Sequence, residues 1–418
     1  MTQLLYGIRA GIRGYISSLS LFTLTSTLSL SVLGPVQAQP ISPVSPRPAS
    51  QARGLALELL GEAVIPVGSL VVDSTEVGGL SGITYDAAND LYFIISDDRS
   101  QKAPARFYQV QLDLTGESFS SEQVQFQGLS LLRDENGETF SSLSLDPEGI
   151  ALTEQGTLWI SSEGDATRGI APFVQEFRQG GETLRSLPLP SKLLPDLANQ
   201  RGVGRNLALE SLTITPDQRY LVTATENALL QDGPEASLSE SSPARILKYD
   251  SVEQAWVGEY VYQTDPVALR PNPADGFTAS GLVELLALNN EATRFLALER
   301  SFSAGATGTA GDTGMTIRLY QVSLAGATNV AEIESLKQVD LATIIPAEKT
   351  LLLDFASLKL PLGNLEGLTF GPRLPDGRRS LIVVSDDNFS EGQFTQFLVF
   401  AIDPSALPLP RPFAVHQP

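Results

Sequence analysis

The stretch LDPEGIALTEQGTLWISSEGD, Leu145 to Asp165, decides the fold of this chain. Glu148 lies near its start, Glu163 near its end, and a Gln-Gly turn lies midway between them. Two apolar runs joined by a turn predict a β-hairpin. Residues equidistant from the turn become cross-strand neighbours. The two carboxylates are therefore expected side by side at the open end of the hairpin.

Four other segments repeat this pattern. They are LSGITYDAANDLYFIISDD (80–98), LESLTITPDQRYLVTATEN (209–227), VELLALNNEATRFLALERS (283–301) and LEGLTFGPRLPDGRRSLIVVSDD (365–387). In each, the turn lies midway between two polar residues, which predicts the pairs Ser81–Asp97, Glu148–Glu163, Glu210–Glu226, Glu284–Glu299 and Glu366–Asp386. Neighbouring like charges cost roughly 0.2–1 kcal/mol on a sheet surface. Repeated acid pairs therefore need a cation, an arginine or strong hydrogen bonds nearby.

Further β-prone segments follow each hairpin, and helical periodicity is weak throughout. Repeated four-stranded units predict an all-β chain folded as a β-propeller. Five blades account for the sequence, although the long interval between Glu299 and Asp386 leaves room for a sixth. The last repeat lacks an outer strand, and residues 54–65 are expected to supply it and close the ring. We predict a propeller domain over residues 54–403 and a C-terminal tail over 404–418.

The N-terminus predicts an export signal over residues 1–38. Arg9 and Arg13 precede an uncharged apolar run, and Val36-Gln37-Ala38 resembles a cleavage site. A Pro/Ser-rich linker is expected over residues 39–53. The mature protein would then be periplasmic or secreted and free of the membrane; an uncleaved membrane anchor is the alternative.

Composition excludes several functions. The chain of 418 residues carries 48 acidic and 28 basic residues, a formal charge of −20 that argues against a nucleic-acid partner. It has no cysteine, so thiolate catalysis and disulfides are excluded. Its one histidine, His416, is expected to be a tail residue without a catalytic role. With no G-x-S-x-G motif either, Ser-His-Asp chemistry is not expected.

Propeller geometry indicates where the acids meet. The open ends of all five hairpins should surround one mouth of the central channel, together with the long loops 227–243 and 302–314. Carboxylates without His or Cys favour a hard cation, Ca²⁺ above all. The expected metal ligands are Asp97, Glu163, Glu226, Glu284, Glu299 and Asp386. The alternative is a ring of structural acids hydrogen-bonded to neighbouring blades.

Arginines close to these acids in the sequence are candidates for binding a phosphate or carboxylate. They are Arg99, Arg168, Arg205 and Arg300. Structural ion pairs with the acids are the alternative. Ser81 occupies the position that carries glutamate in the other repeats.

The segments GLSGITYD, DPEGIAL, LESLTIT and NLEGLTF, with SDDRS, SSEGD, ALERSF and VSDDNF, resemble the family called "esterase-like activity of phytase". The resemblance covers about residues 54–403. It implies an exported propeller linked to phosphate ester hydrolysis. Propeller phytases are similar in outline, with calcium ions in an acidic channel and basic groups that hold phosphates.

The resemblance leads us to expect a phytase-like hydrolase of phosphoric or other esters. Metal-assisted attack of water at the channel mouth would act on a small anionic substrate, with Glu148, Glu210 and Glu366 as catalytic residues. Two alternatives stay open: a non-catalytic propeller that binds a ligand or partner and holds structural calcium, and a lactonase-like hydrolase. A monomer is favoured.

Overall fold

The computed structural model describes residues 57–403, except residues 117, 197, 199 and 308–309. The predicted signal peptide, linker and tail, His416 included, lie outside the described residues. Within the described part, no helix has the length and apolar character needed to cross a bilayer.

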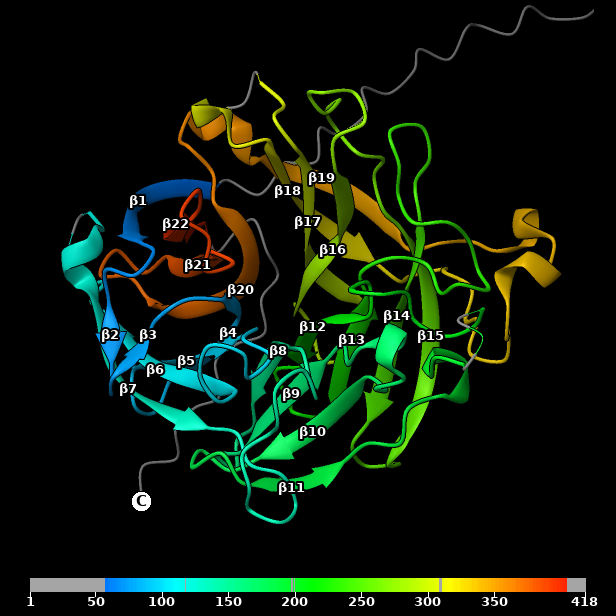
Figure 1. Ribbon diagram of the computed structural model, residues 1–418, viewed down its shortest axis with the longest axis horizontal. Coiled ribbons are helices and arrows are strands. Elements are labelled where there is room, and N and C mark those ends of the chain that lie inside the picture. Colours follow the sequence, from blue (N-terminus) through cyan, green and yellow to red (C-terminus); the bar gives the residue numbers. More distant parts are fainter. Residues whose placement is uncertain (1–56, 117, 197, 199, 308–309, 404–418) are drawn as a thin grey trace, which may run out of the picture. The chain divides into compact units, whose positions relative to one another are not determined.

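Five four-stranded antiparallel sheets are arranged around a common centre (Figure 1). The first comprises β4 (Leu80–Asp86), β5 (Leu91–Ser96), β6 (Arg106–Leu112) and β7 (Val124–Leu131). The second comprises β8 (Pro147–Leu152), β9 (Leu158–Ser162), β10 (Phe173–Phe177) and β11 (Thr183–Ser186). The third comprises β12 (Leu209–Ile214), β13 (Tyr220–Thr225), β14 (Pro243–Asp250) and β15 (Ala255–Gln263). The fourth comprises β16 (Thr278–Ala287), β17 (Arg294–Ser303), β18 (Met315–Ser323) and β19 (Glu348–Asp354).

The fifth sheet combines the two ends of the described chain. It comprises β20 (Asn364–Arg373), β21 (Arg379–Asp386), β22 (Phe394–Ile402) and β1 (Leu57–Pro66). Strand β1 pairs with β22 from Leu57 opposite Ile402 to Pro66 opposite Phe394. The predicted five-bladed, all-β propeller closed by an N-terminal strand is therefore confirmed.

The remaining elements are short. A small hairpin consists of β2 (Val71–Val72) and β3 (Thr75–Glu76). Single 3-10 turns lie in the connections at η1 (Ser121–Gln123), η2 (Ala166–Arg168), η3 (Ser191–Leu193), η4 (Ala310–Asp312), η5 (Leu336–Gln338), η6 (Leu341–Thr343) and η7 (Phe355–Leu358).

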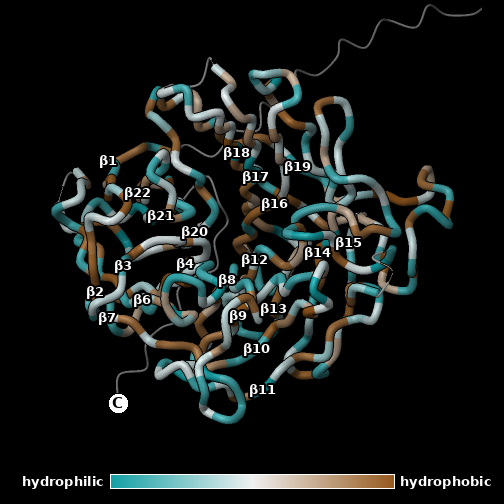
Figure 2. The backbone as a smooth tube through the Cα atoms, viewed as in Figure 1, coloured by the Kyte–Doolittle hydropathy of each residue, from teal (hydrophilic) through white to brown (hydrophobic). Residues whose placement is uncertain are grey.

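The hydrophobic core lies between the blades. Five clusters of buried apolar residues each combine side chains from two neighbouring sheets. Figure 2 shows hydrophobic residues along the strands and hydrophilic ones in many of the connections. Burying both faces of each sheet explains why the second strand of each hairpin is a nearly continuous apolar run.

The first strands of the five sheets line the centre. β4, β8, β12, β16 and β20 each contact the next, and β20 contacts β4. Glycines allow this close approach: a Cβ on Gly82 would lie 2.5 Å from the Glu148 carbonyl oxygen, and one on Gly367 would lie 2.6 Å from that of Ser81. Real Cβ atoms do not approach backbone so closely, so these positions need glycine. We call this narrow level of the channel, with Gly82, Gly149 and Gly367, the glycine waist.

Candidate functional site

A register irregularity occurs in every first strand, near the start in four blades and midway along β16 in the fourth. It lies between Leu80 and Ile83, Pro147 and Ile150, Leu209 and Ser211, Leu282 and Glu284, and Leu365 and Gly367. A bulge redirects side chains and is common near functional sites. The residues that follow the last paired position before this irregularity are Ser81, Glu148, Glu210, Val283 and Glu366.

On the second strand of each hairpin, the residue after the partner of that paired position forms a second set. They are Asp97, Glu163, Glu226, Arg300 and Asp386. In four blades these are the residues that the sequence predicts. In the fourth blade both positions differ by one residue from the prediction, because Leu282, and not Glu284, pairs with Glu299.

The expectation that Glu284 and Glu299 lie together at the mouth is therefore wrong. A shift of one residue moves a strand side chain to the opposite face. Glu299 Oε1 accepts a hydrogen bond from Tyr262 at 2.6 Å, and the carboxylate also contacts Lys349. Glu284 Oε1 accepts backbone N–H groups from Leu285 at 2.9 Å and from Leu212 at 3.3 Å. Arg300 takes the ring position where an acid was expected.

The mouth encloses a cavity of about 570 Å³. Its acidic lining residues are Asp97, Asp98, Asp146, Glu148, Glu210, Glu366 and Asp386, and its basic ones are Arg99, Lys102 and Arg300. Glu163 and Glu226 do not line the cavity but interact with its acids. Both are nearly inaccessible, at 3% and 2% exposure, so water screens their charges poorly.

One group of the acids around the mouth has the geometry of a cation site. Carboxylate oxygens of Asp146, Glu148 and Glu163 all lie within 4.8 Å of one another. Two oxygens that bind one Ca²⁺ can be at most roughly 5 Å apart, which is twice the Ca–O distance. Glu163 Oε2 is buried without a hydrogen-bond partner, while Ala208 N–H donates to its other oxygen. An all-oxygen donor set with an unpartnered carboxylate oxygen fits a hard cation.

The neighbouring hydroxyl group holds Glu148 in place. Ser81 Oγ donates to Glu148 Oε2 at 2.7 Å, so the serine that departs from the repeat supports the adjacent blade's acid. Burial raises the pKa of Glu148 well above its usual value, and the carboxylates of Glu210 and Asp146 add to the rise. Burial also raises the pKa of Asp146 to about 7, although Arg99 opposes the shift.

Arg300 offsets part of the negative charge of Glu226 and Glu366. Its Nη2 lies 3.2 Å from Glu226 Oε1 and 3.4 Å from Glu366 Oε1, while its Nε is buried without a hydrogen-bond partner. Burial alone would lower the Arg300 pKa, but Glu366 and Glu226 outweigh it and the pKa is raised. Arg300 therefore stays protonated. Burial raises the pKa of Glu226 to about 7 against the opposing effect of Arg300.

The remaining ring acids have few compensating charges. Burial raises the pKa of Glu210 well above its usual value, followed by the effects of Glu163 and Glu226. Burial likewise raises the pKa values of Asp97 and Asp386. Asn364 Nδ2 donates to Glu366 Oε1 at 2.8 Å and to Asp386 Oδ2 at 3.2 Å. Burial without enough compensating positive charge thus favours the protonated form of these carboxyl groups, and a bound cation would favour the ionised form.

The other predicted arginines lie in different surroundings. Arg99 lines the cavity and forms ion pairs with Asp165 at 2.7 Å and with Asp146 at 3.4 Å. Arg168 is exposed, donates to the Leu143 carbonyl oxygen and is not among the lining residues. Arg205 is also exposed and outside the lining, although the next residue, Asn206, belongs to it.

Several site residues were missing from the sequence-based set. Asp146 joins the cation cluster, and its place two residues before Glu148 was an available signal. Lys102 lies 4.8 Å from the ring centroid of Phe389, and both line the cavity. Phe277, 69% exposed, and Phe302 also line it, with ring centroids 6.2 Å apart. The mouth thus offers aromatic surfaces above its charged floor.

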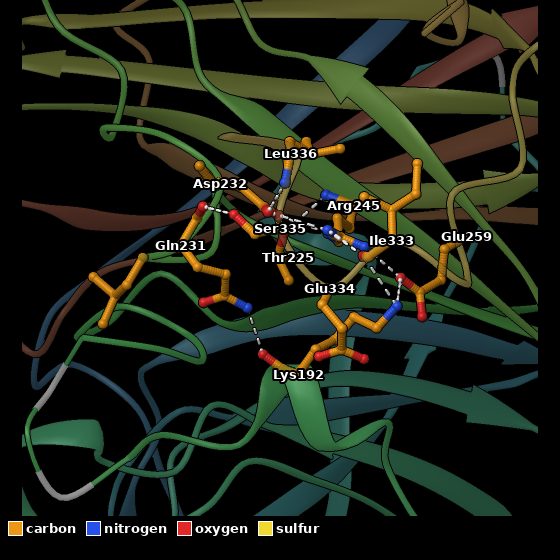
Figure 3. Close-up of polar contacts among 12 residues, drawn as sticks. Lys192, Thr225, Gln231, Asp232, Arg245, Glu259, Ile333, Glu334, Ser335 and Leu336 are labelled. Atoms are coloured by element: carbon orange, nitrogen blue, oxygen red, sulfur yellow. Dashed lines mark hydrogen bonds and ion pairs between the residues drawn. The ribbon is translucent and has the colours of Figure 1, made fainter. Parts of the chain in front are cut away.

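The long loop after β13 does not line the cavity, contrary to expectation. Figure 3 shows why. Its Asp232 Oδ2 accepts from Arg245 Nε at 2.6 Å, and Arg245 Nη1 donates to Glu259 Oε2 at 2.7 Å. Lys192 Nζ lies 3.3 Å from Glu259 Oε2. All four side chains are at most 4% exposed, and their charges are mutually compensated. This network anchors the loop within the fold.

Comparison with protein families identifies one match. The model described as "Phytase-like: Esterase-like activity of phytase" matches residues 75–389. An "Uncharacterized secreted protein" of Arthroderma benhamiae is 25% identical over 192 residues, which are 39% of this chain and 35% of that protein. The match thus spans about a third of the length of that curated relative.

Solved structures match the chain at low similarity. A putative glycoside hydrolase from Parabacteroides distasonis has 10% identity and a TM-score of 0.40, covering 84% of this chain and 95% of that one. The Coprinopsis cinerea GH62 α-L-arabinofuranosidase catalytic domain has 9% identity and a TM-score of 0.41, covering 82% and 96%. The Malassezia sympodialis allergen Mala s 1 has 13% identity and a TM-score of 0.36, covering 83% and 85%. At these values the likenesses carry no functional argument.

Proposed function

The chain belongs to the phytase-like family described by esterase-like activity of phytase, and on this premise we propose that it is an exported, calcium-dependent hydrolase of phosphoric or other esters. The observation that carries the proposal is the cluster of Asp146, Glu148 and Glu163, with its unpartnered buried oxygen. Export is supported by the signal-like N-terminus and by the secreted relative.

Asp146, Glu148 and Glu163 would hold the cation. A bound Ca²⁺ supplies positive charge that offsets the carboxylates and the oxygens of an anionic substrate. Without that charge, the acidic lining would repel a phosphate. Lys102 and Arg99, both in the lining, are placed to orient the anionic group, although Arg99 is also paired with Asp165.

Glu366 is suited to accept a proton from the attacking water. Burial raises its pKa, but Arg300 and the Asn364 amide favour the ionised form. Glu210 is suited to the opposite role, because burial and the nearby Glu163 and Glu226 carboxylates keep it protonated. Water would then lose its proton to Glu366 as it attacks, and Glu210 would protonate the leaving oxygen as the ester bond breaks.

Hydrolysis assays on the purified mature chain test this function. We would measure release of phosphate from phytate and glycerol phosphate, and of p-nitrophenol from p-nitrophenyl phosphate and acetate, with Ca²⁺ and with EDTA. Turnover of one ester class with Ca²⁺ and its loss in EDTA are expected. Folded protein that hydrolyses none of these esters in either condition would overturn the proposal, and turnover of lactones alone would favour a lactonase.

A further inference from the structure

A second cavity, of about 530 Å³, lies at the other end of the five inner strands. Each of the first strands contributes residues near its C-terminal end, among them Thr84, Leu152, Ile214, Leu286 and Phe370. The mouth, in contrast, is lined near the starts of β8, β12 and β20, by Glu148, Glu210 and Glu366. The two linings share no residue, and in β8 and β20 the waist glycines Gly149 and Gly367 lie between them. The two cavities are therefore distinct.

The lining of this far cavity differs in charge from the mouth. Most of it is apolar, with Ile214, Leu286, Leu288 and Phe370 among its walls. Arg373 and Arg379 are the charged residues among those that line it. In a chain with a formal charge of −20, both charged residues of this lining are basic, whereas the mouth is lined by seven acids and three basic residues.

The two arginines are direct cross-strand partners in the β20–β21 pair. Like charges in such positions destabilise a sheet. Arg379 lies 4.1 Å from the Phe370 ring centroid, and Arg373 Nη1 donates to the Gly377 carbonyl oxygen at 3.0 Å. Among the described residues, neither forms an ion pair with an acid. The adjacent Arg378 does, since its Nε lies 2.6 Å from Asp376 Oδ2 and its Nη1 contacts Glu58.

The electrostatics of Arg379 support a missing anionic partner. Burial lowers the pKa of Arg379 to about 10, and the positive charge of Arg373 adds to the effect. An anionic group bound at this arginine pair would offset both effects.

We propose that the far cavity binds a small organic anion, whose carboxylate or phosphate group contacts Arg373 and Arg379 while its apolar body packs against Ile214, Leu286 and Phe370. The guanidinium pair offers several N–H donors in a planar arrangement that suits either oxyanion. The apolar walls favour an aromatic or aliphatic body over a free inorganic ion. This site is independent of the ester hydrolysis proposed for the mouth.

Calorimetry with three related probes tests the site on the full chain treated with EDTA. The probes are 2-naphthoate, naphthalene-1-phosphonate and the neutral 2-naphthamide. One-to-one binding of at least one anion is expected, with 2-naphthamide binding at least about tenfold more weakly. The anion that binds with the higher affinity shows whether the site prefers a carboxylate or a phosphate group.

Three substitutions locate the binding. Arg379→Gln and Arg373→Gln should each weaken the anion about tenfold or more, whereas Arg378→Gln, a matched change at the ion-paired neighbour, should not. Arg373 is exposed, so its variant remains informative if Arg379→Gln does not fold. Arg373→Gln should also keep or raise the unliganded melting temperature, because it removes like-charge repulsion.

No binding of either anion, equal binding of 2-naphthamide, or equal losses in all three variants would each overturn the proposal. Lys102→Gln at the mouth should leave the affinity unchanged, and a tenfold loss in that variant would instead place the anion in the other cavity.

Discussion

Arg300 places a positive charge among the acids of the candidate site. It stands where the other four blades place a carboxylate, and it contacts Glu226 and Glu366 from two neighbouring blades. Among the described residues, Asp146, Glu148 and Glu163 form one ion pair, between Asp146 and Arg99. Arg300 thus offsets part of the acidic charge of Glu226 and Glu366, and the cluster of Asp146, Glu148 and Glu163 is suited to an external cation.

The roles proposed for Glu210 and Glu366 predict different substrate dependence. Glu210→Gln should lower hydrolysis of glycerol phosphate about 100-fold, because its alkoxide leaving group needs a proton. The same variant should change hydrolysis of p-nitrophenyl phosphate much less, since p-nitrophenolate leaves unprotonated. Glu366→Gln should lower both rates. Steady-state kinetics with both substrates measures this.

Glu299→Gln is the matched control for these two variants, since it removes a buried carboxylate outside the mouth cavity. Its kcat for both substrates should stay near that of the parent chain. An equal loss for the two substrates in Glu210→Gln would contradict the proton-donor role.

Stability without divalent cations should fall as pH rises. The pKa of Glu226 is 4.5 in its ordinary state and about 7 in the folded chain, and that of Asp146 changes from 3.8 to about 7. The folded state therefore binds more protons between these values, so its free energy of unfolding decreases from about pH 4 through pH 7. Urea unfolding in EDTA across this range should show the decrease.

Calcium should reverse that trend at the upper end of the range, because a cation binds the ionised carboxylates and its stabilisation grows with pH. A free energy of unfolding that rises from pH 5 to pH 8 in EDTA would contradict the assignment of these raised pKa values.

At the level of elements, the hairpins could be predicted because turn residues and apolar runs specify them locally. The pairs around Glu148 and Glu210 followed from symmetry about the turn. The fourth blade did not, because the pairs Val283–Arg300 and Glu284–Glu299 are equidistant from the same midpoint, so symmetry about the turn does not distinguish them. Choosing the acids placed Glu299 at the mouth instead of Arg300. Asp146 was overlooked because it precedes its strand and lies outside the symmetric pairs.

Substitution of a glycine tests the close packing of the first strands at the glycine waist. Gly367→Ala would place a Cβ 2.6 Å from the Ser81 carbonyl oxygen and force β20 away from β4. The cost should be about 1–3 kcal/mol in the free energy of unfolding. Gly392→Ala is the control, because nothing lies within 4 Å of its added Cβ. Similar urea midpoints for the two variants would contradict the close-packed waist.

For the whole molecule, the ring depends on contacts between its ends. The N-terminal strand could be predicted because the last repeat lacks an outer strand of its own. Strand β1 does pair with β22. The far cavity could not be predicted, because it is formed where the ends of five strands converge. The same ring presents acids from several blades at one end of its strands and, at the other, two arginines that form no ion pair with an acid among the described residues.

Closure of the ring predicts the effect of truncation. A chain that begins at residue 54 retains β1, whereas one that begins at residue 67 leaves the edge of β22 unpaired and the apolar residues against it exposed. The longer chain should unfold in a single cooperative thermal transition, followed by near-ultraviolet circular dichroism. The shorter one should lose that transition. Equal melting temperatures would show that closure by β1 is unnecessary.

Calcium binding to the EDTA-treated protein tests the acidic mouth most directly. Isothermal titration calorimetry should show Ca²⁺ binding that is lost or strongly weakened in Glu163→Gln and Glu148→Gln, because each removes a charge from the three-carboxylate cluster. Glu299→Gln, which neutralises a buried glutamate outside the mouth cavity, should bind as the parent does. Absence of calcium binding in the parent chain, or equal affinity in all of these proteins, would contradict a cation site at the mouth.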